Sequence, residues 1–128
     1  MRFKKVLILD DDEIDLYVSN RVLKSSLFAN EVITATSVKD AMDYLRNHAS
    51  GSFPDFIFLD LNMPGQNGLD FLYEFSELIK EKKISCPVAL LMSVMNSPDP
   101  VTKKAREHPL VKYVFEKPLT DELLKRIS

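Results

Sequence analysis

The fold is decided by a short stretch near the start of the chain, Val6–Asp12, which reads VLILDDD. Four consecutive apolar residues favour a strand that is buried on both faces, as in a parallel sheet. Two later stretches repeat the arrangement: Phe56–Asp60 (FIFLD) and Tyr113–Pro118 (YVFEKP). Because the carboxyl ends of parallel strands meet at one edge of a sheet, we expect two acidic clusters and a lysine to gather there.

Length and composition fit one ordinary globular domain. The chain has 128 residues, of which 45% are hydrophobic and 28% charged, and this is enough apolar material for one core. We therefore interpret residues 1–128 as a single domain. The formal net charge of −2 gives no reason to expect direct binding to nucleic acid. Cys86 is the only cysteine, and we interpret it as a small buried residue in a reducing compartment.

The first residues do not resemble an export signal or a membrane anchor. Residues 1–5 carry charges, and only four apolar residues follow them before Asp10. A signal peptide needs a longer apolar core, and a membrane span needs about 20 residues. We therefore expect a cytoplasmic protein that has no membrane partner.

Strand-like and helix-like segments alternate along the chain. Strands are predicted over residues 4–9, 31–35, 55–60, 88–92 and 110–115. The first helix is predicted from Glu13 to Leu27, with one face formed by Ile14, Tyr17, Val18 and Val22. Further helices are predicted after a cap at Ser37, around residues 71–79, from Ser97-Pro98 to about His108, and over 120–127.

Five strands that alternate with five helices indicate an α/β fold built on a doubly wound parallel sheet. We expect the flavodoxin-like strand order 2-1-3-4-5, with helices on both faces. In this order the first and third strands are neighbours. Asp10 and Asp11 should therefore lie within reach of Asp60, although about 50 residues separate them in the sequence.

Asp60 is the most informative of these acids. Helices often begin with acidic residues that favour the helix dipole, which accounts for Asp12 and Glu13. Asp60 instead ends a strand and precedes a loop rich in turn formers. An aspartate can carry a phosphoryl group as an acyl phosphate. Clustered carboxylates need a cation, hard oxygen ligands suit Mg²⁺, and Lys117 can add a compact positive charge.

This combination resembles the receiver domain of two-component response regulators, in particular stand-alone regulators of the chemotaxis type, over essentially the whole chain. The matching segments are Val6–Asp12, Phe56–Gly68 and Lys117–Leu119. The most specific is the pattern Asp-x-x-Met-Pro-x-x-x-Gly, which runs from Asp60 to Gly68. The resemblance implies a signalling domain rather than an enzyme, although such a domain can catalyse its own phosphorylation and dephosphorylation.

The resemblance also implies roles for individual residues. Asp60 would receive a phosphoryl group from a histidine of a sensor histidine kinase or of a histidine phosphotransfer protein. Mg²⁺ would bind to Asp11 and Asp60, to Asp10 through water, and to the backbone carbonyl of Asn62. Lys117 would pair with the phosphoryl group, and the peptide bond before Pro118 would be cis.

The sequence departs from the family pattern at two positions. The family carries a Thr or Ser at the end of the fourth strand, whereas counting from Pro87 places Met92 there and Ser93 one residue later. We expect Ser93 to lie near the site, with a bulge or an early strand end near Met92, or else Met92 to take the position. The family also tends to carry an aromatic residue three positions before the lysine. Here that residue is Val114, and we expect Tyr113 to face the other side of the strand.

Two other functions stay open at the level of sequence. The pattern Asp10-x-Asp12 fits the opening motif of haloacid-dehalogenase-like phosphatases, in which Asp10 would be the nucleophile, but that family needs a later acidic pair. The second alternative is a receiver-fold binding module that is not phosphorylated.

The output surface is less defined by the sequence. By resemblance, the fourth helix, fifth strand and fifth helix would contact a downstream protein or a second copy. We interpret the basic cluster Lys103, Lys104 and Arg106 as a solvated face. The chain would either act alone by docking or be part of a longer protein.

Overall fold

A computed structural model describes residues 3–63, 68–93 and 98–127. It contains one five-stranded parallel sheet in the order β2-β1-β3-β4-β5, which confirms the predicted topology. The strands are β1 (Phe3–Leu9), β2 (Ala29–Ala35), β3 (Phe56–Asp60), β4 (Val88–Met92) and β5 (Val111–Glu116). The helices are α1 (Glu13–Ser25), α2 (Val38–Asn47), α3 (Gly68–Lys82), α4 (Pro100–Arg106) and α5 (Asp121–Leu124).

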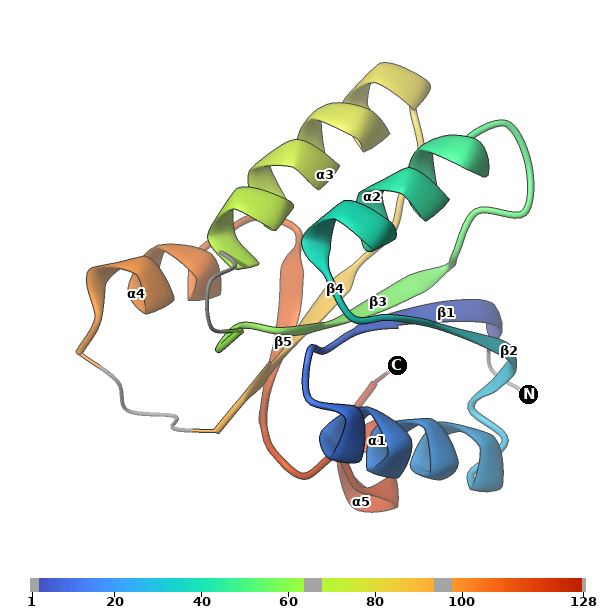
Figure 1. The fold of residues 1–128 in the computed structure, drawn as a ribbon, viewed down its shortest axis with the longest axis vertical. Helices are drawn as coiled ribbons and strands as arrows, with labels where there is room; N and C mark the ends of the chain where they lie inside the picture. The colour runs from blue at the N-terminus through green and yellow to red at the C-terminus, as the bar shows by residue number, and fades with distance from the viewer. Residues whose placement is uncertain (1–2, 64–67, 94–97, 128) are drawn as a thin grey trace.

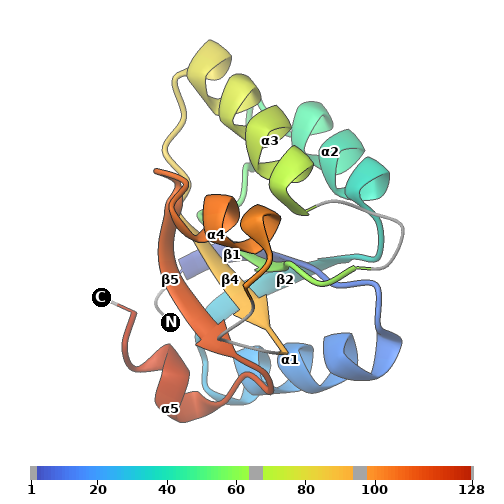
Figure 2. The ribbon, with the colours of Figure 1, turned by 90° about the vertical axis from the view of Figure 1, so that its left-hand side faces the viewer.

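The helices cover both faces of the sheet. Figures 1 and 2 show α2, α3 and α4 on one side and α1 and α5 on the other. Alternate residues of β1 enter the two layers: Leu7 and Leu9 join the cluster under α2 and α3, whereas Val6 and Ile8 join the cluster under α1 and α5. All four are fully buried. Each contributes roughly 1.5–3 kcal/mol by burial, which explains why the sequence carries an unbroken apolar run here.

The side chains that cap the helices are the expected ones in two places. Ser37 Oγ accepts a hydrogen bond from the Asp40 N–H at the start of α2. Asp12 caps α1 by accepting hydrogen bonds from the N–H groups of Ile14 and Asp15. The assignment of Asp12 to the entry of the first helix is therefore confirmed.

Several helix boundaries differ from the prediction: α3 is longer than predicted at both ends, and α5 ends at Leu124, three residues before the predicted end. α4 begins at Pro100, with Asp99 as its cap, so it starts two residues after the predicted Pro98. α1 ends at Ser25, and Leu27 beyond it has a left-handed φ of 56°, which a continuing helix cannot accommodate. The predicted cap at Ser97, the motif residues 64–67 and the segment 94–97 lie outside the described residues.

Of the apolar face that we predicted on α1, Val22 packs against the cluster under α1 and α5, but the other three residues do not pack on the sheet. Ile14 is 76% exposed and Tyr17 61% exposed, and Val18 is also exposed. The residues of α1 that are buried are Ser19 and Leu23. The helix therefore packs one side on the core and exposes an apolar stripe on another side. The prediction failed for these three residues because regular spacing places residues on a common face without showing which face is covered.

Cys86 is buried, as expected, and burial raises the pKa of its thiol to about 12. The thiol therefore stays protonated at neutral pH, which agrees with a packing role. Among the described residues, no helix is both long enough and apolar enough to cross a membrane.

Gly68, the last residue of the Asp60–Gly68 motif, is buried at the start of α3. A Cβ at this position would lie 2.9 Å from Leu61 Cδ1 and 3.4 Å from Leu61 Cα. The glycine therefore lets α3 begin directly against the residue that follows Asp60.

We expect Gly68→Ala to destabilise the protein by about 1 kcal/mol, because Leu61 must shift to make room. Urea denaturation measures the effect. Gly51→Ala is the matched control, since a Cβ at that position would have no other atom within 4 Å, and it should be neutral or slightly stabilising. Equal effects of the two substitutions would contradict this explanation.

Candidate functional site

The parallel sheet brings the predicted acids together. Leu9 of β1 pairs with Leu59 of β3, so the residues that follow them, Asp10 and Asp60, leave the sheet side by side. One carboxylate oxygen from each of Asp10, Asp11 and Asp60 lies within 4.8 Å of the others. Asp10 and Asp60 are buried, whereas Asp11 is half-buried. The cluster thus opens toward solvent through Asp11.

Lys117 closes the cluster from the end of β5. Its ammonium nitrogen lies 2.9 Å from Asp10 Oδ2, 3.0 Å from Asp15 Oδ2 and 3.2 Å from Asp60 Oδ2. Its backbone N–H donates to the Met92 carbonyl at 2.8 Å. The peptide bond between Lys117 and Pro118 is cis, as the resemblance implies. The predicted convergence of Asp10, Asp11, Asp60 and Lys117 is therefore found.

Backbone N–H groups hold the two buried acids in place. Asp10 Oδ1 accepts from the Asp12 N–H at 2.9 Å, and Asp60 Oδ1 accepts from the Asn62 N–H at 3.1 Å. Each acid thus binds the amide two residues ahead of it, which is a common turn arrangement for aspartate. Both oxygens of Asp10 are occupied, one by this amide and the other by Lys117.

The electrostatics of the site follow from crowding and burial. Burial and the neighbouring charge of Asp10 raise the pKa of Asp60 to about 6, although Lys117 acts in the opposite direction. Burial by itself would lower the pKa of Lys117, but its hydrogen bonds to Asp10 and Asp15 and the charge of Asp60 outweigh burial and raise the pKa. At neutral pH Asp60 is mostly an ionised carboxylate and Lys117 is an ammonium.

The donor set fits a hard divalent cation. It consists of carboxylate oxygens, and the single positive charge of Lys117 leaves the three clustered acids with an excess of negative charge. Mg²⁺ favours a few carboxylates together with water, and the partial exposure of Asp11 leaves room for water. Asn62 is exposed and adjoins the cluster; the role of its carbonyl as a ligand stays a prediction.

The end of β4 differs from one of the two predicted arrangements. β4 pairs with β5 through Met92, opposite Glu116, and the register shift lies at the other end, between Val88 and Ala89. The expected bulge or early end near Met92 is therefore not found in the described strand. Met92 is fully buried in the cluster under α2 and α3.

Ser93 follows as an exposed residue, and its N–H lies 3.4 Å from Asn62 Oδ1. Ser93 is thus close to the loop that follows Asp60, although this hydrogen bond is at the long end of the usual range. The orientation of its hydroxyl toward Asp60 stays a prediction.

The two faces of β5 are occupied as predicted. Tyr113 packs against the cluster under α1 and α5, with ring centroids 5.8 Å from Phe115 and 6.2 Å from Phe56. Val114 packs against the opposite cluster, which contains Met92. The two positions where the family pattern has a hydroxyl and an aromatic ring are therefore apolar and belong to the same core layer.

One site residue was missed in the sequence. Asp15 lies in the first turn of α1 and binds Lys117 across 102 residues of sequence. An acid in a first helical turn is ordinary, because it favours the helix dipole. The sequence held no further signal, and only the three-dimensional structure shows that the Lys117 side chain reaches the first turn of α1.

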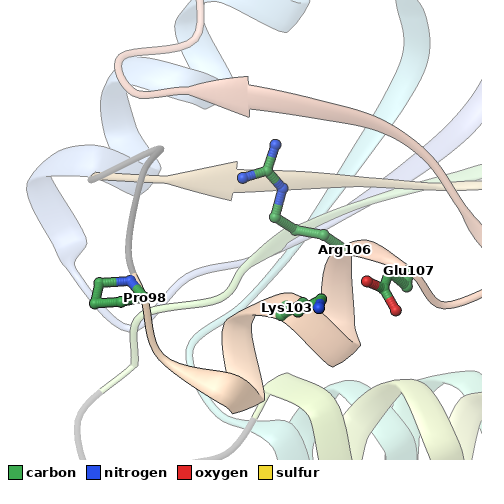
Figure 3. A pocket seen from close by; sticks show the side chains of 4 residues that line it. All are labelled: Pro98, Lys103, Arg106 and Glu107. Atoms are coloured by element: carbon green, nitrogen blue, oxygen red, sulfur yellow. The ribbon is translucent and has the colours of Figure 1, made fainter.

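A pocket beside α4 lies near the basic cluster. Figure 3 shows the side chains that line it: Pro98, Lys103, Arg106 and Glu107. Lys103, Lys104 and Arg106 are all exposed, in agreement with a solvated face. None of these lining residues belongs to the acidic cluster of Asp10, Asp11 and Asp60, so this pocket is separate from the candidate site.

Comparison with known proteins identifies the family. The parallel five-stranded sheet, with clustered acids and a lysine at its carboxyl edge, is the arrangement that the resemblance to receiver domains implies. The family model described as "Response regulator receiver domain" matches residues 6–128. The chain belongs to this family, whose members act in two-component signal transduction. This membership supports the signalling interpretation and not the phosphatase alternative.

Two curated relatives illustrate the settings in which such domains occur. The chain is 34% identical over 93 residues, or 72% of its length, to hybrid signal transduction histidine kinase L of Dictyostelium discoideum. It is 30% identical over 99 residues, or 75% of its length, to the response regulator Rcp1 of Synechocystis. The matched region spans 5% of the kinase and 66% of Rcp1.

Solved structures agree with the fold. A two-component response regulator from Cytophaga hutchinsonii has a TM-score of 0.85 and 29% identity, covering 98% of this chain and 94% of that one. The bacteriophytochrome response regulator AtBRR has a TM-score of 0.76 and 26% identity, covering 98% and 90% of the two chains. The receiver domain of CKI1 from Arabidopsis thaliana, with 20% identity and a TM-score of 0.81, covers 98% and 92% and shares the fold.

We expect Asp60→Asn to stabilise the Mg²⁺-free protein at about pH 8, by about 1–3 kcal/mol. The pKa of Asp60 is raised from 3.8 to about 6, so the folded protein binds this proton more tightly than the unfolded chain does. The stability that Asp60 contributes is thus complete below about pH 4 and is lost as the pH rises through about 6. Asn cannot ionise and avoids the loss.

Urea denaturation in EDTA at several pH values between about 4 and 8 measures this difference. Asp43→Asn is the control, because Asp43 is half exposed and forms its ion pair with the exposed Lys39. A stabilisation by Asp60→Asn that is equal at all pH values would contradict the assigned cause.

Proposed function

We propose that residues 1–128 form one receiver domain and that Asp60 is its phosphoryl acceptor, in a reaction that requires Mg²⁺. The observation that carries this proposal is the group of side chains at the sheet edge. Asp60 is buried beside Asp10 and Asp11, and Lys117 Nζ lies 3.2 Å from the Asp60 carboxylate. A carboxylate so placed has a nucleophilic oxygen, groups to hold a cation, and a fixed ammonium to receive the phosphoryl oxygens.

The chemistry follows from these positions. A carboxylate oxygen of Asp60 attacks the phosphorus of a phosphohistidine on the donor protein. The new P–O bond forms as the P–N bond breaks, and the electron pair of that bond returns to the imidazole nitrogen. Lys117 donates a hydrogen bond to the transferred phosphoryl group. Asp11, Asp60 and the backbone carbonyl of Asn62 would hold Mg²⁺, with Asp10 bound to it through water. Mg²⁺, when bound, supplies positive charge that offsets the charge of the phosphoryl oxygens.

We expect wild-type protein to gain one phosphoryl group from acetyl phosphate and Mg²⁺, and Asp60→Asn to gain none. The measurement is intact mass before and after treatment with hydroxylamine, which cleaves acyl phosphates. EDTA should abolish the reaction, and Asp11→Asn should slow it by weakening metal binding.

Asp43→Asn, which removes a carboxylate that is exposed on α2, is the matched control and should react like wild type. An Asp60→Asn protein that gains a hydroxylamine-sensitive phosphate as efficiently as wild type would show that the acceptor is another residue. A wild-type protein that gains none from any donor would favour the binding module that is not phosphorylated.

We further propose that the phosphodonor protein contacts α1. The first turn of this helix borders the site through Asp15, and the exposed stripe of Ile14, Tyr17 and Val18 continues from that turn. A protein that delivers a phosphohistidine to Asp60 has to rest on a neighbouring surface, and exposed apolar side chains next to the site suit that contact.

We expect the double substitution Ile14→Ser with Tyr17→Ser to slow phosphotransfer from a histidine kinase core that phosphorylates the wild-type protein, by at least about tenfold. Phosphorylation by acetyl phosphate should stay unchanged, because this small donor needs no docking surface. Leu27→Ser, at an exposed apolar residue beyond the other end of α1, is the control. An equal loss with both donors would indicate damage to the site and would refute the docking role.

The output surface is the remaining part of the proposal. We assign it to α4, β5 and α5, which would contact a downstream protein or a second copy. Val101 and the basic residues of α4 are exposed there. Amide exchange that changes on phosphorylation only outside these elements would contradict the assignment.

A further inference from the structure

Asp15 is a partner of Lys117 that stands apart from the acids that can hold a metal. Its Oδ2 lies 3.0 Å from Lys117 Nζ. Among the described residues, the group with the spacing for a metal ion consists of Asp10, Asp11 and Asp60, without Asp15. Asp15 therefore places a negative charge beside Lys117, where the phosphoryl group would bind, and takes no part in metal binding.

In this state the ammonium of Lys117 donates hydrogen bonds to Asp10 and Asp15 and forms an ion pair with Asp60. A lysine ammonium carries three N–H groups, and three carboxylate oxygens surround it at 2.9, 3.0 and 3.2 Å. A phosphoryl group that arrives on Asp60 brings several acceptor oxygens and about two negative charges. Its oxygens can form additional hydrogen bonds with the Lys117 ammonium only if another carboxylate releases its own contact with that ammonium.

Asp15 is the carboxylate that can release Lys117 at the lowest cost. The Asp15 side chain is 44% exposed, whereas the Asp10 side chain is fully buried. Water can replace the lost hydrogen bond at Asp15, but a buried Asp10 without its cation would be a desolvated and unpaired charge. When a phosphoryl group binds, Lys117 can thus exchange Asp15 for it while keeping its contact with Asp10.

We propose that Asp15 is a positioning residue that competes with the phosphoryl group for Lys117 and thereby weakens the hold of the site on that group. The inference rests on the proposed role of Asp60 as the acceptor. It assigns to the first turn of α1 a control over phosphoryl affinity that is separate from metal binding.

Beryllofluoride, whose fluorines stand in for phosphoryl oxygens, tests the proposal without group transfer. Titration at saturating Mg²⁺, followed by amide NMR spectra, gives its apparent affinity. We expect Asp15→Asn to bind about threefold more tightly than wild type, or tighter still, since one competing charge at a partly exposed position is removed. Glu13→Gln removes the same charge from an exposed residue of the same helical turn and should bind like wild type.

A second readout follows Lys117 itself in the protein without metal or beryllofluoride. The NMR signal of its ε-methylene group should shift in Asp15→Asn, because the ammonium loses a partner, and should stay in place in Glu13→Gln. A merely structural effect of the substitution on α1 would not single out this side chain.

The outcomes separate this inference from the function on which it rests. If wild-type protein does not bind beryllofluoride in a manner that requires Asp60 and Mg²⁺, the proposed function fails, and the inference fails with it. If wild type binds but Asp15→Asn binds equally or more weakly, only the competing role of Asp15 is refuted. If Glu13→Gln binds beryllofluoride as tightly as Asp15→Asn does, the loss of any negative charge nearby explains the effect. That result would also refute the competing role of Asp15.

Discussion

The repulsion among carboxylates at one edge of the sheet, held in check by Lys117, is the constraint on which the site depends. Asp10 and Asp60 are buried beside each other, and the raised pKa of Asp60 reflects the free energy of keeping it ionised there. Lys117 reaches them from the end of β5, while its backbone N–H binds the end of β4. The site thus joins the ends of four neighbouring strands, and the strand order that buries the core also gathers the charges.

The sequence predicted the sheet and the main acids because both follow from short-range patterns. Unbroken apolar runs mark strands that are buried on both faces, and the residue after each run marks the sheet edge. The face of α1 was not predictable in this way. Ile14, Tyr17 and Val18 have the spacing of a core stripe, yet they are exposed, and spacing alone cannot distinguish a packed stripe from a docking stripe. The Asp15 contact depends on where the first turn of α1 lies relative to Lys117, which local sequence does not encode.

The end of β4 constrains how a change at Asp60 can reach α4. Met92 and Val114 pack in the same apolar layer, so neither offers a polar group to a phosphoryl oxygen. Two backbone contacts connect this end of β4 to the site: the Ser93 N–H approaches the Asn62 side chain, and the Lys117 N–H binds the Met92 carbonyl. A movement of Lys117 or Asn62 therefore pulls directly on the backbone at the end of β4, without a side-chain hydroxyl at Met92 as an intermediary.

Helix α1 combines two features in its first turns. Its first turn carries Asp15, which binds Lys117, and the same turn begins the exposed stripe of Ile14, Tyr17 and Val18. Asp12 stabilises this turn by capping the helix with two hydrogen bonds. A protein that docks on the stripe and displaces α1 by a fraction of an ångström would change the distance between Asp15 and Lys117. Because the strength of an ion pair depends on that distance, a donor that docks on α1 as proposed would also change the positive charge that Lys117 offers to the phosphoryl group.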